Sequence, residues 1–171
     1  MQFSVTDTNV EALKAKKSAV ILGYMKDEFI NFIVPDYIRK EVVLNKGYWS
    51  RYYCIYNLAH QFLLSCSDDV QILSVGCGLD TMPFNLFKSF KEQYNRTNFS
   101  IFECDLKSVV TQKVKFISSH SKLEETIASQ SEEVNVGPDH IKTNRYSLFD
   151  VDLNDIGYLQ KQLEKFGFDP E

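Results

Sequence analysis

Gly76-Cys77-Gly78 is the part of this sequence whose residue types best fit a ligand site. The tripeptide follows an apolar run at residues 70–75, and Thr81 and Pro83 open an amphipathic stretch after it. Because glycine has no Cβ, such a turn lets backbone N–H groups at a helix N-terminus approach a ligand closely. The pattern predicts a strand, a turn and a helix around a bound ligand. The alternative is a tight turn that binds nothing.

Carboxylates follow two further strand-like runs. Residues 99–102 lead into Glu103-Cys104-Asp105, and a third run at residues 145–152 ends in Asp152. An acidic side chain beyond a strand of a parallel sheet can hold ribose hydroxyls. We therefore expect Asp105 to lie beside the glycine turn as a ribose ligand, with Asp152 at the equivalent place on the third strand. For each of them, N-capping of the following helix is the alternative.

Thr81 occupies the position at which a dinucleotide-binding G-x-G-x-x-G motif has its third glycine. This departure weakens a nicotinamide-dependent dehydrogenase as an interpretation. It favours the methyltransferase version of the sheet, which holds no pyrophosphate and so does not need that glycine. The sequence thus predicts a nucleoside-cofactor site.

Helical periodicity precedes the first strand. Residues 9–33 predict a helix that is broken near Gly23, and Pro35 ends the pattern. The aromatic-rich segment 46–53 then leads into a further helix. Four residues share one apolar face of that helix: Ile55, Leu58, Phe62 and Cys66.

Strands and helices alternate from residue 70 onward, which is typical of a doubly wound parallel sheet. Right-handed crossovers place three such strands in the order 3-2-1. Three strands form only half of this kind of sheet, so we expect it to be incomplete. Residues 119–144 are mostly polar and predict a mobile excursion with one helical turn. Gly167 is expected to cap the last helix.

Composition narrows the class of protein. The chain has 171 residues, of which 44% are hydrophobic, enough for a packed core. A net charge of -4 without a basic cluster makes nucleic acid an unfavoured partner. Four cysteines without a CxxC pair and three scattered histidines predict no metal site. Because no signal peptide or bilayer-spanning run is present, we expect a cytoplasmic protein without a membrane partner.

Four blocks of this sequence occur in an order and spacing that resemble the N-terminal half of the leucine carboxyl methyltransferase family. They are Lys16-Lys17-Ser18-Ala19-Val20 with Gly23-Tyr24; residues 45–51; residues 71–81; and, after Phe102-Glu103-Cys104-Asp105, Arg145-Tyr146 with residues 152–156. The resemblance implies a Rossmann-like S-adenosylmethionine-dependent methyltransferase. Residues 1–66 would form a helical lid, and residues 67–171 would form the first half of the core.

The resemblance also implies a donor, an acceptor and a set of contacts. The donor is S-adenosylmethionine, and the acceptor is the C-terminal leucine carboxylate of a protein phosphatase 2A catalytic subunit. No catalytic base is required, because a peptide C-terminal carboxylate is already ionised at neutral pH. The donor contacts would be as follows: Arg51 with Lys16 at the methionine carboxylate, Gly76 at the methionine portion, Asp105 at the ribose, and Asp152 with Leu153 around adenine.

The sequence departs from the family pattern at residues 168–171. Family members there enter a fourth strand with a Thr-Leu-x-x-Ala-Glu type of motif. We therefore expect a donor half-site rather than a complete enzyme. Two other functions stay open: a related carboxyl methyltransferase of the transfer-RNA wybutosine pathway, and a catalytically dead, truncated interaction module. Without the resemblance, Arg51 would be an aromatic-stacked surface arginine and Lys16 a solvated helix residue.

Overall fold

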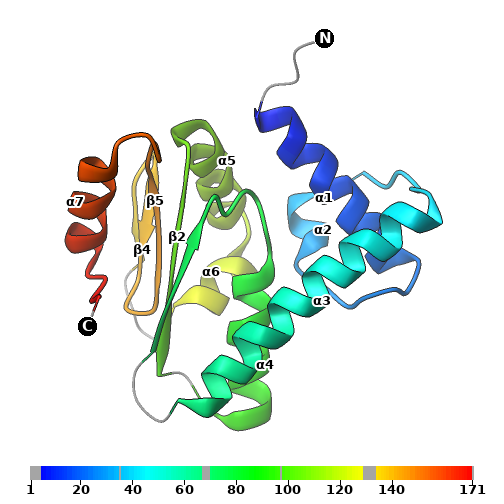
Figure 1. The fold of residues 1–171 in the computed structure, drawn as a ribbon, viewed down its shortest axis with the longest axis horizontal. Coiled ribbons are helices and arrows are strands. Elements are labelled where there is room, and N and C mark those ends of the chain that lie inside the picture. Colours follow the sequence, from blue (N-terminus) through cyan, green and yellow to red (C-terminus); the bar gives the residue numbers. More distant parts are fainter. Residues whose placement is uncertain (1–4, 35, 67–69, 97, 129–133, 171) are drawn as a thin grey trace.

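The computed structural model describes residues 5–34, 36–66, 70–96, 98–128 and 134–170, and it has an α/β fold (Figure 1). The helices are α1 (Val5–Ile21), α2 (Ile30–Ile33), α3 (Val42–Ser65), α4 (Met82–Tyr94), α5 (Lys107–Ser118), α6 (Ser121–Ile127) and α7 (Ile156–Phe166). The strands are β1 (Val70–Val75), β2 (Phe99–Asp105), β3 (Asn135–Val136), β4 (His140–Lys142) and β5 (Tyr146–Asp150). The α/β fold class predicted from the sequence is confirmed.

The strands form one mixed sheet in the order β1-β2-β5-β4-β3. β1 pairs in parallel with β2, and β2 with β5, whereas β4 is antiparallel to both of its neighbours. The expectation of an unstructured excursion over residues 119–144 is therefore wrong for most of that segment, which holds α6 and the β3–β4 pair. The sequence signal for α6 and the β3–β4 pair was weak because they contain few buried apolar side chains. The buried ones in α6 and β4 are Leu123, Ile127 and Ile141. Residues 129–133 lie outside the described residues.

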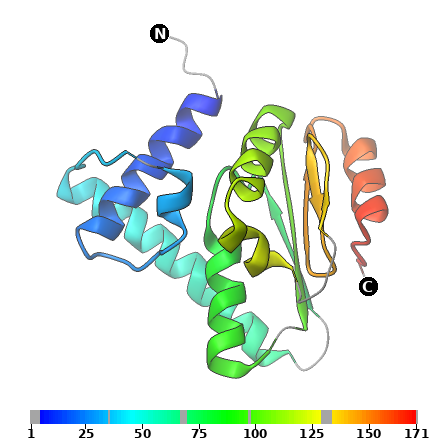
Figure 2. The ribbon, with the colours of Figure 1, turned by 180° about the vertical axis from the view of Figure 1, so that it is seen from behind.

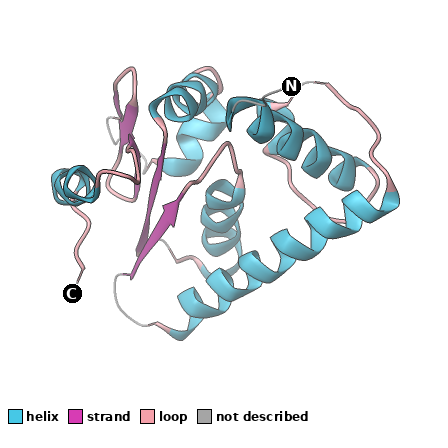
Figure 3. Cartoon of the chain, turned by 45° about the horizontal axis from the view of Figure 1, so that its top comes forward, coloured by secondary structure: helices cyan, strands magenta, loops and turns pink. Residues whose placement is uncertain are grey.

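Helices cover the two faces of the sheet unequally (Figures 1 and 3). α4, α5 and α6 lie on one face and build the main core, which includes Phe84, Phe87, Val110, Ile117 and Leu148. α7 lies on the other face, where Phe166 packs with Phe102 and Phe149 in a smaller cluster. The C-cap of α7 is Gly167, at φ +89°, as the sequence predicted.

α1, α2 and α3 stand beside α4 and α5, away from the strands that α7 covers (Figure 2). The predicted break near Gly23 is confirmed, because α1 ends at Ile21 and Gly23 has φ +78°. The aromatic segment belongs to α3 itself, which runs unbroken from Val42 to Ser65. The described part of the chain contains no helix long and apolar enough to cross a membrane.

The apolar face of α3 singled out in the sequence faces solvent. Ile55, Leu58 and Phe62 are 44%, 68% and 47% exposed. Leu63 is fully buried instead, and Tyr56 and Ala59 pack against the main core on the same side of the helix. The spacing of large aliphatic residues did not identify the inner face of α3, because a tyrosine and an alanine pack there beside the leucine.

β1 is only half-buried, and Val75 at its end is 46% exposed. The apolar run at residues 70–75 forms the predicted strand but does not bury it fully, because β1 lies at the edge of the described sheet beside β2. The apolar side chains of β1 pack partly buried on both faces: Val70 and Ile72 lie against the main core, and Leu73 lies against the smaller cluster. The C-terminal residues return to this strand, where the backbone N–H of Asp169 donates to Oε1 of Gln71 at 2.9 Å.

Candidate ligand site at the carboxyl ends of the parallel strands

Backbone hydrogen bonds join the carboxyl ends of the three parallel strands. The N–H groups of Gly76 and Cys77 donate to the carbonyl oxygen of Cys104, at 2.8 and 3.2 Å. On the other side of β2, the N–H of Val151 donates to the carbonyl oxygen of Asp105 at 2.9 Å. The glycine turn, Asp105 and the segment after β5 are thereby brought to one edge of the sheet.

The glycine turn leaves open space in front of its first glycine. Gly76 and Gly78 both have positive φ angles, +69° and +56°, which disfavour residues with a Cβ. A Cβ on Gly76 would meet no atom within 4 Å, so its backbone is accessible to a ligand. A Cβ on Gly78 would lie 3.3 Å from Oδ1 of Asn9 in α1, which shows that α1 reaches over the turn.

Asp105 connects β2 to the glycine turn. Its Oδ2 accepts a hydrogen bond from the N–H of Gly78 at 2.7 Å, and its Oδ1 accepts one from the N–H of Leu106 at 2.7 Å. The capping alternative is wrong for Asp105, because the N-cap residue of α5 is Leu106 and no side chain caps this helix. Each carboxylate oxygen has a second lone pair, so both can still accept a hydroxyl from a ligand.

Asp152 is exposed just beyond β5, with Leu153 exposed beside it. Its Oδ1 accepts hydrogen bonds from the backbone N–H and the side-chain amide of Asn154, at 3.0 and 2.8 Å. The capping alternative is wrong for Asp152 too. Asp155 caps α7, accepting the N–H of Tyr158 at 2.9 Å. Asp152 therefore stabilises the loop after β5 through Oδ1. These hydrogen bonds do not use its other carboxylate oxygen, Oδ2.

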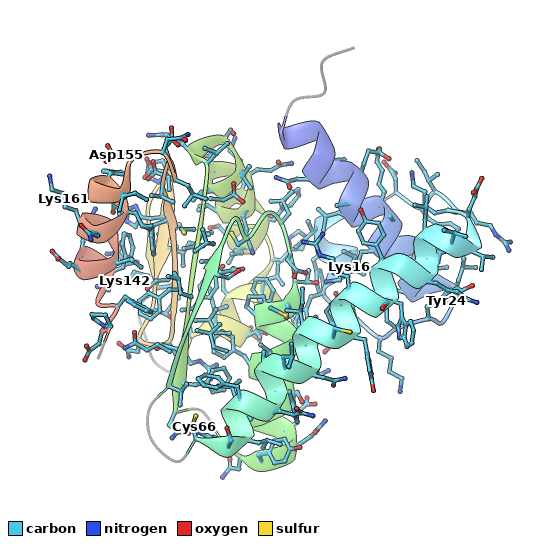
Figure 4. All side chains as sticks on the ribbon, in the orientation of Figure 1. Lys16, Tyr24, Cys66, Lys142, Asp155 and Lys161 are labelled. Carbon is cyan, nitrogen blue, oxygen red and sulfur yellow. The ribbon has the colours of Figure 1, made fainter. Side chains whose placement is uncertain are left out.

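Lys16 lies inside the protein rather than in solvent (Figure 4). The residue is 6% exposed, so the alternative of a solvated helix lysine is wrong. Its Nζ donates to Oδ1 of Asp80 at 2.7 Å and to the hydroxyl of Thr81 at 2.6 Å, and it lies 2.9 Å from Oδ2 of Asp27. The ammonium also lies 4.6 Å from the centre of the Tyr52 ring. These contacts place Lys16 at the C-terminal end of the glycine motif.

The charges around Lys16 keep it protonated. Burial alone would lower the pKa of the Lys16 ammonium, but the carboxylates of Asp80 and Asp27 outweigh burial and raise it. Burial would likewise raise the pKa of Asp80, and the Lys16 ammonium outweighs this effect and lowers it. Lys16 and Asp80 are therefore both ionised at neutral pH.

Arg51 lies on the exposed side of α3. Among the described residues, no ion pair, hydrogen bond or aromatic stacking of its guanidinium is found. Its neighbour Tyr52 is the residue that contacts Lys16. The structure therefore brings Lys16, Gly76 and Asp105 together, and it leaves Arg51 next in sequence to the cluster without a contact to it.

Sequence reasoning missed a second buried cluster beneath the turn. Lys113 of α5 and Glu103 of β2 are almost wholly buried, with Nζ and Oε2 2.7 Å apart. The hydroxyl of Tyr146 donates to the same oxygen at 2.6 Å. Burial would lower the pKa of Lys113, but Glu103 outweighs burial and raises it. The signal was present: Lys113 falls within the inward apolar face of α5.

Sequence reasoning also missed Asp27 and Asp80. Asp27 precedes a short apolar run, and its Oδ1 accepts hydrogen bonds from the N–H groups of Phe29 and Ile30, at 3.0 and 3.2 Å. These bonds are typical of the turn before a helix, so the role of Asp27 before α2 could have been predicted, although the N-cap residue of α2 is Phe29. Its contact with Lys16 could not, because the two residues lie on separate segments of the chain.

The residues at this edge fit a nucleoside with an amino-acid tail. The open space at Gly76 accepts a ligand close to the backbone. The side-chain Nδ2 of Asn9 is buried over the turn and lacks a hydrogen-bond partner among the described residues. Carboxylates and a cation stand beside this space. In the same part of the chain, no group of three His, Cys, Asp or Glu side chains could hold a metal ion.

Together these features define an α/β protein with a candidate ligand site at the carboxyl ends of parallel strands, where such folds bind their ligands. Comparison with known families makes the assignment specific. A family model described as leucine carboxyl methyltransferase matches residues 5–171, and the chain belongs to that family. The family resemblance drawn from the sequence is confirmed.

Curated relatives carry two kinds of name. "Leucine carboxyl methyltransferase 1 homolog" of Arabidopsis thaliana is 34% identical over 158 residues, covering 92% of this chain and 46% of the relative. "Leucine carboxyl methyltransferase 1" of Yarrowia lipolytica is 34% identical, covering 90% and 52%. "tRNA wybutosine-synthesizing protein 4" of Aspergillus fumigatus is 28% identical, covering 94% and 15%. The chain thus spans about half the length of its leucine carboxyl methyltransferase 1 relatives.

Proposed function

We propose that this chain provides the donor-binding half of an S-adenosylmethionine-dependent carboxyl methyltransferase. The acceptor is the C-terminal leucine carboxylate of a protein phosphatase 2A catalytic subunit, in the cytoplasm. The observation that carries the proposal is the open backbone at Gly76 beside Asp105, whose carboxylate holds the same glycine turn through Gly78. Residues 1–66 act as a helical lid, and residues 67–171 form the first half of a Rossmann-like core.

Each candidate residue then has a distinct role toward the donor. Arg51 and Lys16 bind the methionine carboxylate, for which a guanidinium offers two parallel hydrogen bonds. The backbone at Gly76 lies against the methionine portion. Asp105 accepts hydrogen bonds from the ribose, and Asp152 with Leu153 surrounds the adenine.

The methyl transfer itself requires no general base. S-adenosylmethionine supplies an electrophilic methyl group, and the acceptor carboxylate, with a pKa of about 3.3–3.7, is already a nucleophile at neutral pH. The protein contributes by aligning the two reactants and by excluding water from them. We assign the exclusion of water to the helices α1 to α3, and the reach of α1 over the glycine turn supports this assignment.

Donor binding is tested by calorimetry with S-adenosylmethionine and the 171-residue chain. Arg51→Ala is expected to weaken binding about tenfold or more, since a hydrogen-bonded charge contributes about 1.5–3 kcal/mol. Asp105→Ala is expected to weaken it at least as much, because it also releases Gly78. Arg39→Ala, an exposed arginine outside the site, is the matched control and should bind as wild type does.

The acceptor is a separate question, because the relatives include a protein named for transfer-RNA wybutosine synthesis. Incubation with methyl-labelled donor and either acceptor distinguishes the two. Label on the phosphatase C-terminus supports the proposal, and label on transfer RNA alone supports the wybutosine alternative. A folded chain that binds no donor would instead indicate an interaction module.

A further inference from the structure

Among the described residues, Asp27 is one of two carboxylates that contact the Lys16 ammonium, and it is the buried one. It lies in the loop before α2, and its side chain is completely buried. Its Oδ2 lies 2.9 Å from the Lys16 ammonium and also accepts the hydroxyl of Thr81. Its Oδ1 is fixed by the N–H groups of Phe29 and Ile30. One carboxylate therefore joins α1, the start of α2 and the end of the glycine motif.

The two carboxylates beside Lys16 differ in how firmly they are held. The side chain of Asp80 is 41% exposed, and its Oδ1 also accepts the N–H of Thr81 at 2.7 Å. The Asp27 carboxylate has no exposed surface and is held by the N–H groups of Phe29 and Ile30 and by the hydroxyl of Thr81. An arriving anion can therefore replace Asp80 at Lys16 through the solvent-facing side, whereas Asp27 stays in place.

We propose that Asp27 is a positioning residue for the methyl donor. It holds the Lys16 ammonium beside the glycine turn, so that the ammonium can bind the carboxylate of the donor's amino-acid tail. The inference rests on the proposed function and adds to it a residue that does not touch the donor. Without the Asp27 charge, Asp80 is the one anionic partner that Lys16 keeps among the described residues, and the ammonium is drawn toward it.

The test separates the amino-acid tail from the rest of the donor. S-adenosylhomocysteine carries the tail, whereas 5′-methylthioadenosine has the same adenosine and sulfur without it. Asp27→Asn keeps an acceptor oxygen for the start of α2 and removes the charge that faces Lys16. This variant is expected to bind S-adenosylhomocysteine about tenfold more weakly, with methylthioadenosine affinity unchanged within about twofold.

Two further variants make the measurement specific. Asp36→Asn, at an exposed position outside the cluster, should leave both affinities unchanged. In a Lys16→Met background, Asp27→Asn should cause no additional loss for S-adenosylhomocysteine, because Asp27 acts through Lys16. Equal weakening of both nucleosides by Asp27→Asn, no weakening of either, or a full additional loss in the Lys16→Met background would overturn the inference.

Circular dichroism establishes first that Asp27→Asn is folded. If it is not, Thr81→Val takes its place, since valine has the same shape and lacks the hydroxyl that bonds both Lys16 and Asp27. Thr81→Val should weaken S-adenosylhomocysteine and spare methylthioadenosine, and an equal effect on both overturns the inference. If the wild-type chain binds neither nucleoside, the proposed function itself fails, which is a distinct result.

Discussion

At the scale of single residues, the protein buries a charged pair, Lys113 and Glu103. Lys113 is a lysine on the inward face of α5, and it is tolerated there because Glu103 lies 2.7 Å away and the Tyr146 hydroxyl completes the hydrogen bonding of that carboxylate. A buried ion pair adds little net stability, since desolvation offsets its attraction. Removing one partner is costly, because the other charge then stays buried alone.

Replacing Lys113 should therefore destabilise the protein far more than replacing an exposed lysine of the same helix. Lys113→Met is expected to lower the free energy of unfolding by about 3–5 kcal/mol. Lys115→Met, at an exposed position two residues on, should change it by less than about 0.5 kcal/mol. Adding Glu103→Gln to Lys113→Met should restore part of the loss, since no unpaired charge remains. Urea unfolding measures all three, and a mild Lys113→Met effect would contradict the buried-pair account.

The four cysteines should differ in reactivity according to burial. Burial raises the pKa of the Cys77 thiol well above its ordinary value, and it raises the pKa of Cys104 to about 11. Only the thiolate is nucleophilic, so both should stay unmodified by iodoacetamide at pH 8. Cys54 is exposed and should react readily. Peptide mass spectrometry follows each site, and alkylation of Cys77 as fast as Cys54 in folded protein would refute the prediction.

At this scale, the sequence pointed to some residues and missed others for identifiable reasons. The glycine turn and Asp105 were predictable, because glycines after an apolar run and a carboxylate after the next one are local signals. Asp27 meets Lys16 only when separate segments come together, so no local pattern reveals this contact, whereas the buried position of Lys113 was visible in the apolar face of α5. The helix α7 begins three residues later than an N-cap at Asp152 would require, so Asp155 rather than Asp152 caps it.

Among the elements, α7 and α3 each have a glycine, but one has a backbone conformation that favours glycine and the other has a regular helical position. Gly167 ends α7 with φ +89°, a conformation that costs a residue with a Cβ about 1–2 kcal/mol. Gly47 lies inside α3, and a Cβ there would meet no atom within 4 Å. A glycine inside a helix is less favourable than alanine by about 0.5–1 kcal/mol.

Alanine substitution should consequently act in opposite directions at these two glycines. Gly167→Ala is expected to lower the melting temperature, and Gly47→Ala to raise it. Thermal unfolding followed at 222 nm compares the two single variants with wild type, each serving as the other's control. A loss of stability in Gly47→Ala would show that α3 is not a regular helix at this position.

How well each element could be predicted depended on how much apolar surface it buries. β2 and β5 bury nearly every residue, and their apolar runs gave clear signals. The β3–β4 pair buries only Ile141 among its residues, so its polar sequence resembled a loop. The exposed outer face of α3, with Leu58 at its centre, shows the converse: apolar spacing without burial.

Over the whole molecule, carboxylates tie the N-terminal helices to the helices that cover the sheet. Glu28, just before α2, accepts hydrogen bonds from Lys88 of α4 and from Lys122 of α6. Asp80 pairs with Lys16 of α1 in the same way. Loss of these carboxylate charges would weaken the attachment of α1 and α2 to the helices of the sheet, so this attachment should depend on pH.

Acid should therefore lower the stability of the folded protein by protonating Glu28. The hydrogen bond from Lys88 lowers the pKa of this carboxyl below its ordinary value of 4.5, so the unfolded chain takes up a proton more readily than the native one. The stabilisation is complete above that pH and is lost as the pH falls through the lower native value. Glu28→Gln cannot titrate, and its urea midpoint should fall less steeply than that of wild type between pH 5 and pH 3. The difference between the two slopes should shrink in 1 M NaCl, because the pair is partly exposed and salt screens it. Identical slopes at low salt would mean that the contacts of Glu28 with α4 and α6 do not stabilise the protein.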